Sequence, residues 1–370
     1  MNRFLLMVSL CVMGGVATLV PPVAIAQTPT ASPDPSLAEN IAQNSTQQIN
    51  DLLRRGRELV DANDCAGAII TYREAAALDS DNARIFSAIG FCYARQSNFP
   101  EAVDAYQRAI ALDNRNANFQ YALGFSLANL GDYEAAASAY RRATELDPNN
   151  VEAFLGLGVV LTREGDYDGA LRAYQQVISL RPNNTQVFEF MGAVYIQQGR
   201  FQEAVNILKQ AADLAPRRGS IQINLGVALL SLGDVDEGLV ALKRAADLEP
   251  RNAQIHLQIG NILRSQGDVD RAIQYYQQAI SADATSVQAH ELIGEILLEQ
   301  QDYLRAIVAY RRVVELAPQD PDGYYHLGLA LQGRERNQEA VAALETARDL
   351  YRQQQNTEGV DTVEAILRDL

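Results

Sequence analysis

Small and bulky residues recur along this chain with a fixed period of 34 residues. With residues 49–82 as the first unit, nine units follow one another without insertion or deletion and end at residue 354. A period in this range indicates one supersecondary unit stacked on copies of itself, so we predict a long repeat array. The eighth position of every unit is glycine: Gly56, Gly90, Gly124, Gly158, Gly192, Gly226, Gly260, Gly294 and Gly328.

The remaining pattern predicts two antiparallel helices in each unit. The twentieth position is alanine in every unit except one, where it is Gly238, and the twenty-seventh is alanine or valine. Helices approach each other closely only where neither projects a bulky side chain, so these small positions mark a helix crossing. The bulk lies at the twenty-fourth position: Tyr72, Tyr106, Tyr140, Tyr174, Leu208, Leu242, Tyr276, Tyr310 and Leu344.

Proline and glycine mark where these helices end. Proline cannot continue a helix, and it holds the thirty-second position of five units, as Pro148, Pro182, Pro216, Pro250 and Pro318. Glycines at the fifteenth position predict a tighter turn between the two helices of a unit: Gly131, Gly165, Gly199, Gly233 and Gly267. The first and last units depart from the pattern, with Asn63 replacing the turn glycine and Arg352 replacing the proline.

This pattern resembles the tetratricopeptide repeat family over residues 49–354. Gly-Asp-Tyr at 131–133 and 165–167 and Asp-Pro-Asn-Asn at 147–150 are similar to the turns of that family. The resemblance implies an all-α fold, a right-handed α-solenoid of nine helix-turn-helix repeats. Together with the secretory signal predicted below for residues 1–26, the repeats are similar to those of exported bacterial proteins, cyanobacterial ones among them.

The resemblance also implies that the first helix of each unit lines a concave groove that binds a segment of a partner protein. Apolar and aromatic residues dominate the first two-thirds of the implied lining: Phe91, Arg95, Asn118, Tyr121, Phe125, Asn129, Leu155, Val159, Arg163, Ile196, Ile223, Val227 and Leu230. An acidic row, Glu291, Glu295 and Glu299, follows near its end. The alternatives are that some of the apolar residues pack between units and that the glutamates are a solvated helix face. The lysine and asparagine pattern with which some family members clamp a carboxylate is absent.

The two ends of the chain lie outside the repeats. Arg3, the apolar run 4–20 and the small-x-small site Ala24-Ile25-Ala26 predict a secretory signal over 1–26, cleaved before Gln27; the alternative is an uncleaved membrane anchor. Residues 27–48 are rich in polar residues and proline, which predicts a disordered tether. Asp361 to Glu364 are similar to a capping box, and the apolar spacing of Val360, Val363, Leu367 and Leu370 predicts a C-terminal capping helix within 355–370.

Composition and motifs narrow the chemistry. With 31 basic against 46 acidic residues and no basic stripe, the chain is not expected to bind nucleic acid. It has no phosphate-binding loop, nucleophile elbow or metal-protease motif, so we expect no enzyme activity and no cofactor. We expect His256, His290 and His326 to pack rather than bind a metal. Cys65 and Cys92 fall at the same end of neighbouring helices, where they form either a disulfide or two buried thiols.

These observations predict a non-enzymatic protein-interaction scaffold with a partner segment in its groove. After signal cleavage we expect no membrane span and a location in the periplasm or an equivalent extracytoplasmic compartment, such as the thylakoid lumen. The alternative is an accessory subunit of an envelope enzyme complex, for polysaccharide export or glycosyl transfer, in which a partner chain performs catalysis.

Overall fold

The computed structural model describes residues 35–370, and over that range the chain forms nineteen α-helices and no strands. The predicted signal at 1–26 and the tether residues 27–34 lie outside the described residues. The first helices of the nine units are α1 (Pro35–Asp61), α3 (Ala83–Arg95), α5 (Ala117–Leu130), α7 (Val151–Glu164), α9 (Thr185–Gln197), α11 (Gly219–Leu232), α13 (Ala253–Ser265), α15 (Val287–Glu299) and α17 (Pro321–Gly333). The second helices are α2 (Cys65–Leu78), α4 (Phe99–Leu112), α6 (Tyr133–Leu146), α8 (Tyr167–Leu180), α10 (Phe201–Leu214), α12 (Val235–Leu248), α14 (Val269–Ala282), α16 (Tyr303–Leu316) and α18 (Asn337–Gln353).

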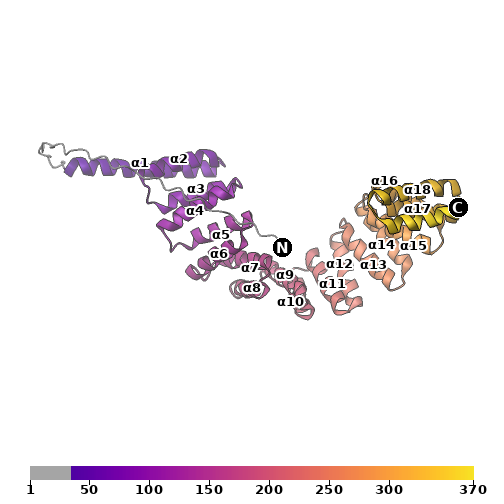
Figure 1. Cartoon of the computed structure of the whole chain (residues 1–370). Coiled ribbons are helices and arrows are strands. Elements are labelled where there is room, and N and C mark those ends of the chain that lie inside the picture. Colours follow the sequence, from indigo (N-terminus) through magenta and orange to yellow (C-terminus); the bar gives the residue numbers. More distant parts are fainter. Residues whose placement is uncertain (1–34) are drawn as a thin grey trace, which may run out of the picture.

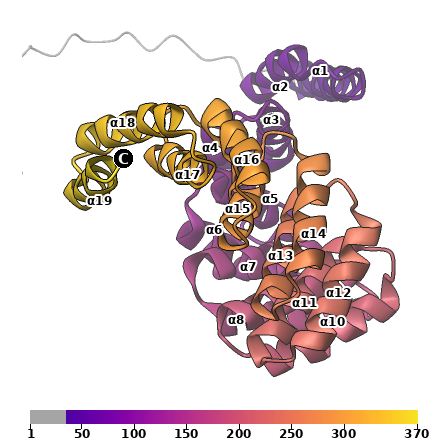
Figure 2. The ribbon, with the colours of Figure 1, turned by 90° about the vertical axis from the view of Figure 1, so that its right-hand side faces the viewer.

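The helix pairs follow one another in a curved stack, which confirms the predicted α-solenoid. In Figure 1 the stack descends from α1 and α2, passes through α8 to α10 at its lowest part, and rises again to α16 to α18. Figure 2 shows the same course from the side as a coil that ends in α17, α18 and α19. The apolar core is correspondingly a succession of buried clusters along the stack, each shared by neighbouring units. Within residues 35–370, none of the helices has the length and apolarity that a membrane span requires.

The turns within the units confirm the expected backbone and extend it to every unit. The five turn glycines have φ between 70° and 86°. The other four units place a non-glycine residue at the same fifteenth position, and it also has positive φ: Asn63, Ser97, Gln301 and Glu335, at 58° to 63°. The next residue is the N-cap of the second helix, which begins one residue later. Asp64, Asp132 and Asp166, for example, each accept a hydrogen bond from a backbone N–H of the first turn.

The first helix is longer than the repeat pattern predicts. Residues 35–48, which we expected to be part of a disordered tether, form the first half of α1. Composition alone did not predict this part of the helix. The second half of α1 packs against α2, and this packed half nucleates the helix from which residues 35–48 extend. Extending an existing helix through alanine, glutamate and glutamine then costs little.

The expected capping helix is present as α19 (Thr357–Arg368). Val363 is completely buried against Leu344, Ala347 and Tyr351 of α18, so α19 covers the open side of the last unit. The proposed capping box was wrong, because the Asn356 side chain caps this helix by accepting from the Gly359 backbone N–H at 3.0 Å. Asp361 to Glu364 therefore lie inside the helix rather than at its start.

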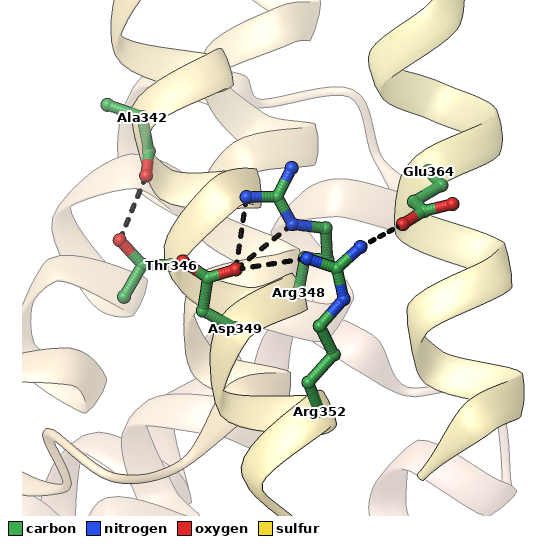
Figure 3. Close-up of polar contacts among 6 residues, drawn as sticks. All are labelled: Ala342, Thr346, Arg348, Asp349, Arg352 and Glu364. Carbon is green, nitrogen blue, oxygen red and sulfur yellow. Dashed lines mark hydrogen bonds and ion pairs between the residues drawn. The ribbon is translucent and has the colours of Figure 1, made fainter. Parts of the chain in front are cut away.

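Arg352, which stands where other units have proline, has a structural role at this end. Without a proline, α18 continues for 17 residues, whereas α16 has 14. The Arg352 guanidinium forms an ion pair with Glu364 of α19 and lies 3.7 Å from the carboxylate of Asp349 in α18 (Figure 3). The departure from the repeat pattern thus fastens the capping helix to α18.

Candidate functional site

The eighth and twenty-fourth positions of each unit meet at the helix crossing. A Cβ atom added to Gly90 would lie 3.0 Å from ring atoms of Tyr106, and one added to Gly226 would lie 2.8 Å from Cγ of Leu242. The same contact recurs in all nine units. Each glycine therefore leaves space for a large side chain beneath the first helix, and that side chain forms the floor under the inner face.

A hollow of about 480 Å³ lies on the inner face of the first three units. Phe91 and Asn118, both predicted for the groove, line it, and Tyr72 and Tyr106 lie at its floor. Burial raises the pKa of both tyrosine hydroxyls, so they remain neutral. The other lining residues come from α1, α3 and α5: Arg57, Val60, Asp61, Arg84, Ser87, Ala88, Phe119 and Ala122.

Two aromatic side chains are exposed at this end of the groove. Phe91 is 46% exposed and Phe125 is 43% exposed. The Phe125 ring meets the edge of Phe99 from α4, with ring centroids 6.3 Å apart. Tyr121, which we also predicted to line the groove, is half-buried against Tyr140 at 5.9 Å between centroids. The exposed aromatic surface therefore consists of two phenylalanines rather than three rings.

Arg95 and Asn129 have partners within the chain. The Arg95 guanidinium donates to the Val60 carbonyl at 3.2 Å and to Oδ1 of Asn63 at 2.6 Å, so it joins the second unit to the turn of the first. The Asn129 amide donates to the Phe125 carbonyl at 2.8 Å. These contacts hold both side chains in place within the chain, and their role in binding a partner segment stays a prediction.

The middle of the predicted lining serves mainly to pack the units together. Leu155, Ile196, Ile223 and Leu230 are partly buried against the core clusters, and Val227 is half-buried. Val159 is 38% exposed, and Arg163 is exposed as well. The alternative of packing between units thus holds for most of the aliphatic residues here.

The acidic row near the end of the groove includes an internal counter-charge. Arg264 of α13 donates to Glu295 and to Glu299, each at 2.7 Å. Glu291 has no cationic partner within residues 35–370, and burial together with the charges of Asp320, Glu295 and Asp322 raises its pKa. The row is therefore not a uniformly solvated face.

The cysteines and histidines form no metal centre in the described part of the chain. Cys65 and Cys92 are buried free thiols, and burial and the neighbouring Cys65 raise the pKa of Cys92 to about 12. His256 stacks on Tyr275 and His326 stacks on Tyr310, at 6.2 and 5.2 Å between ring centroids. His290 is half-buried, and desolvation lowers its pKa.

Sequence reasoning missed several residues of the hollow, of which Arg57, Asp61, Arg84 and Ser87 are polar. They occupy the ninth and thirteenth positions of the first unit and the second and fifth positions of the second unit. The same four positions hold predicted groove residues in the second and third units, namely Phe91, Arg95, Asn118 and Tyr121. The signal was therefore present, and applying the same rule to the first unit would have found Arg57.

Comparisons with known proteins agree with this architecture. Residues 23–254 match the family model described as the cilia and flagella-associated protein 70 C-terminal domain, and residues 239–287 and 257–321 match a tetratricopeptide repeat model. A TPR repeat-containing protein of Picosynechococcus is 47% identical over 55 residues, which cover 15% of this chain and 14% of that protein.

Two solved structures show the same fold. The C-terminal part of a TPR repeat-containing protein from Cytophaga hutchinsonii covers 74% of this chain and 99% of its own, with a TM-score of 0.51 and 16% identity. A tetratricopeptide repeat protein from Parabacteroides merdae covers 68% of this chain and 99% of its own, with a TM-score of 0.50 and 17% identity. At these identities the likeness is one of fold alone.

Proposed function

The chain belongs to the family of tetratricopeptide repeat domains that includes the cilia and flagella-associated protein 70 C-terminal domain, and we propose that it is a protein-interaction scaffold. A segment of a partner protein binds along the inner face of the first three units. The chain contributes no catalytic step of its own and holds its partner for assembly outside the cytoplasm.

The observation that carries this proposal is the exposed Phe91, which lines the hollow of about 480 Å³, together with the exposed Phe125 on the first helix of the next unit. Large aromatic side chains usually carry much of the binding energy of a protein interface when they become buried in it. Arg57 and Arg84 add hydrogen-bond donors around the apolar centre, which suits a segment with both apolar side chains and backbone carbonyls.

The proposed location rests on residues 1–26. A positive start, an apolar run and a small-x-small site are the three parts of a secretory signal. We infer that the mature chain begins at Gln27. Intact-mass measurement of protein isolated from its native cells tests this inference, and a mass that includes Met1 would refute it.

Photo-crosslinking tests the binding surface directly. A photoreactive phenylalanine analogue at position 91 is expected to crosslink one partner, which mass spectrometry identifies. The same analogue at Val240, which is 67% exposed on α12, is the matched control. The partner is then purified, and its affinity for the Phe91→Ala, Phe125→Ala double variant is measured.

We expect that double variant to lose on the order of 1–3 kcal/mol of binding free energy. Tyr121 is left unchanged because its ring packs on Tyr140, so its loss would disturb the fold. Equal crosslinking at positions 91 and 240, or an unchanged affinity with intact helical content, would refute the proposed surface.

A further inference from the structure

The inner face of units eight and nine gathers acidic side chains from α15 and from the start of α17. They are Glu291, Glu295, Asp320 and Asp322, which we call the acidic site. Asp320 caps α17 by accepting from the backbone N–H groups of Asp322 and Gly323, at 3.2 and 3.3 Å. Asp322 also accepts from the Tyr351 hydroxyl. Three of the four acids thus have an internal donor outside the acidic site, whereas the side-chain hydrogen-bond partner of Glu291 among the described residues is another acid, Asp320.

Within residues 35–370, Arg264 is the cation that forms ion pairs at this site. Arg264 contacts Glu295 and Glu299 but forms no ion pair with Glu291. Glu291 is half-buried, and the charged neighbours that act on it are all acidic. Half-buried carboxylates without a counter-charge cost free energy, which a cation brought by a ligand would offset.

A second observation, independent of these acids, concerns Tyr310. Its side chain is 1% exposed, and its hydroxyl has no hydrogen-bond partner among the residues that the structure describes. A Cβ added to Gly294 would lie 2.7 Å from Cζ, the ring atom that bears this hydroxyl. The hydroxyl therefore lies under the segment of α15 that connects Glu291 to Glu295.

The preceding unit shows which acceptor such a hydroxyl uses. There Tyr276 donates to Oδ1 of Asn261, the residue that follows Gly260, at 2.8 Å. The equivalent residue after Gly294 is Glu295, whose carboxylate is held by Arg264 instead. Unit eight thus combines a carboxylate without a cation and a buried hydroxyl without an acceptor, and both lie on the same stretch of α15.

We propose that the acidic site receives a lysine or arginine side chain of the bound partner segment. Glu291 pairs with the incoming cation, whose charge competes with Arg264 for Glu295 and lets that carboxylate turn toward the Tyr310 hydroxyl. The carboxylates of the described residues do not form a metal-ligand group, so an organic cation suits the site better than a metal ion. This inference rests on the proposed function, because it names the chemistry of the same partner at the far end of the groove.

Two blocked peptides test the proposal, acetyl-Ala-Ala-Arg-Ala-Ala-amide and its citrulline counterpart. Citrulline keeps the planar shape of arginine but carries no charge. Calorimetric titration of the full chain is expected to show binding of the arginine peptide, with an affinity at least about tenfold above that of the citrulline peptide. Higher salt concentration should weaken the binding of the arginine peptide.

Glu291→Gln should weaken binding of the arginine peptide by about tenfold. Glu145→Gln makes the same charge change at an exposed pair with Arg142 on α6 and should leave the affinity unchanged. Equal affinity for both peptides, or a Glu291→Gln variant that binds like the unchanged chain, would overturn the proposal.

The same titration separates this inference from the proposed function. The Phe91→Ala, Phe125→Ala variant should bind the arginine peptide normally, because its changes lie in units two and three. If that variant loses the crosslinked partner while the arginine peptide fails to bind the unchanged chain, only the acidic site is refuted. If the peptide binds as expected and the double variant keeps the partner, only the phenylalanine surface is refuted.

Discussion

The ring of Tyr140 occupies the space where a side chain of Gly124 would be, with a Cβ on Gly124 only 2.9 Å from its Cδ1. We therefore expect Gly124→Ala to destabilise the chain by about 1–3 kcal/mol, because the ring must move out of a packed crossing. Denaturant unfolding measures the change. Tyr140→Leu, which copies the residue of three other units, should recover part of the loss in the double variant. Strictly additive effects of the two changes would mean that the residues do not share this space.

The four non-glycine residues at the fifteenth position of a unit have positive φ, and replacing them with glycine should stabilise the chain. Ser97 and Gln301 have φ of 58° and 60°, a conformation that costs most side chains about 1–2 kcal/mol. Ser97→Gly or Gln301→Gly removes this cost and should stabilise the chain by about 0.5–1 kcal/mol. The gain is smaller than the cost removed, because glycine also gives the unfolded chain more conformational entropy. Gly131→Ala, at φ 82° with no atom nearby, is the matched reverse change and should destabilise it. Thermal unfolding of the three variants checks the signs.

Periodicity predicted the units and their turns because both depend on contacts within one repeat. The contact of Gly90 with Tyr106 and the turn at Gly131 need only local spacing, so their positions in the sequence are sufficient. The direction in which the Arg95 side chain points could not be predicted from local spacing. Its hydrogen bonds to Val60 and Asn63 depend on how the second unit is rotated against the first.

The same limit explains the other differences in the candidate site. Tyr121 lies at a groove position, yet the ring of Tyr140 offers it an aromatic partner and draws it into the stack. At the C-terminus, Asn356 precedes the proposed capping box by five residues and makes an earlier cap. Both outcomes are choices between two locally acceptable arrangements, and tertiary contacts decide them.

The paired thiols predict slow chemical modification. Burial and Cys65 raise the pKa of Cys92 from its usual 9 to about 12, and only the thiolate reacts. At equal pH the thiolate fraction of Cys92 should therefore be much smaller than that of an ordinary thiol. Reduced, folded protein should therefore react slowly with iodoacetamide at Cys92 and rapidly once unfolded. Mass spectrometry follows the reaction at each cysteine, and fast labelling of folded protein would contradict the buried arrangement.

Glu291 predicts a pH-dependent stability difference. Burial and the charges of Asp320, Glu295 and Asp322 raise its pKa in the folded state. Its favourable contribution is therefore present below its unfolded pKa and is lost as the pH rises through the raised folded value. Glu291→Gln should be more stable than the unchanged chain at neutral pH, and this advantage should vanish in acid. Urea unfolding at both pH values, with Glu145→Gln as the control, measures the effect; an equal advantage at both would contradict it.

Two tyrosines at the same repeat position should respond oppositely to loss of the hydroxyl. The Tyr310 hydroxyl is buried without a partner, so Tyr310→Phe removes an unpaired polar group and should stabilise the free chain by about 1 kcal/mol. The Tyr276 hydroxyl donates to Asn261, so Tyr276→Phe loses a hydrogen bond and should destabilise it by about 0.5–1.5 kcal/mol. Urea unfolding of both variants gives the two signs. Because both changes keep the ring beneath its glycine, destabilisation by both would show that the Tyr310 hydroxyl is already paired.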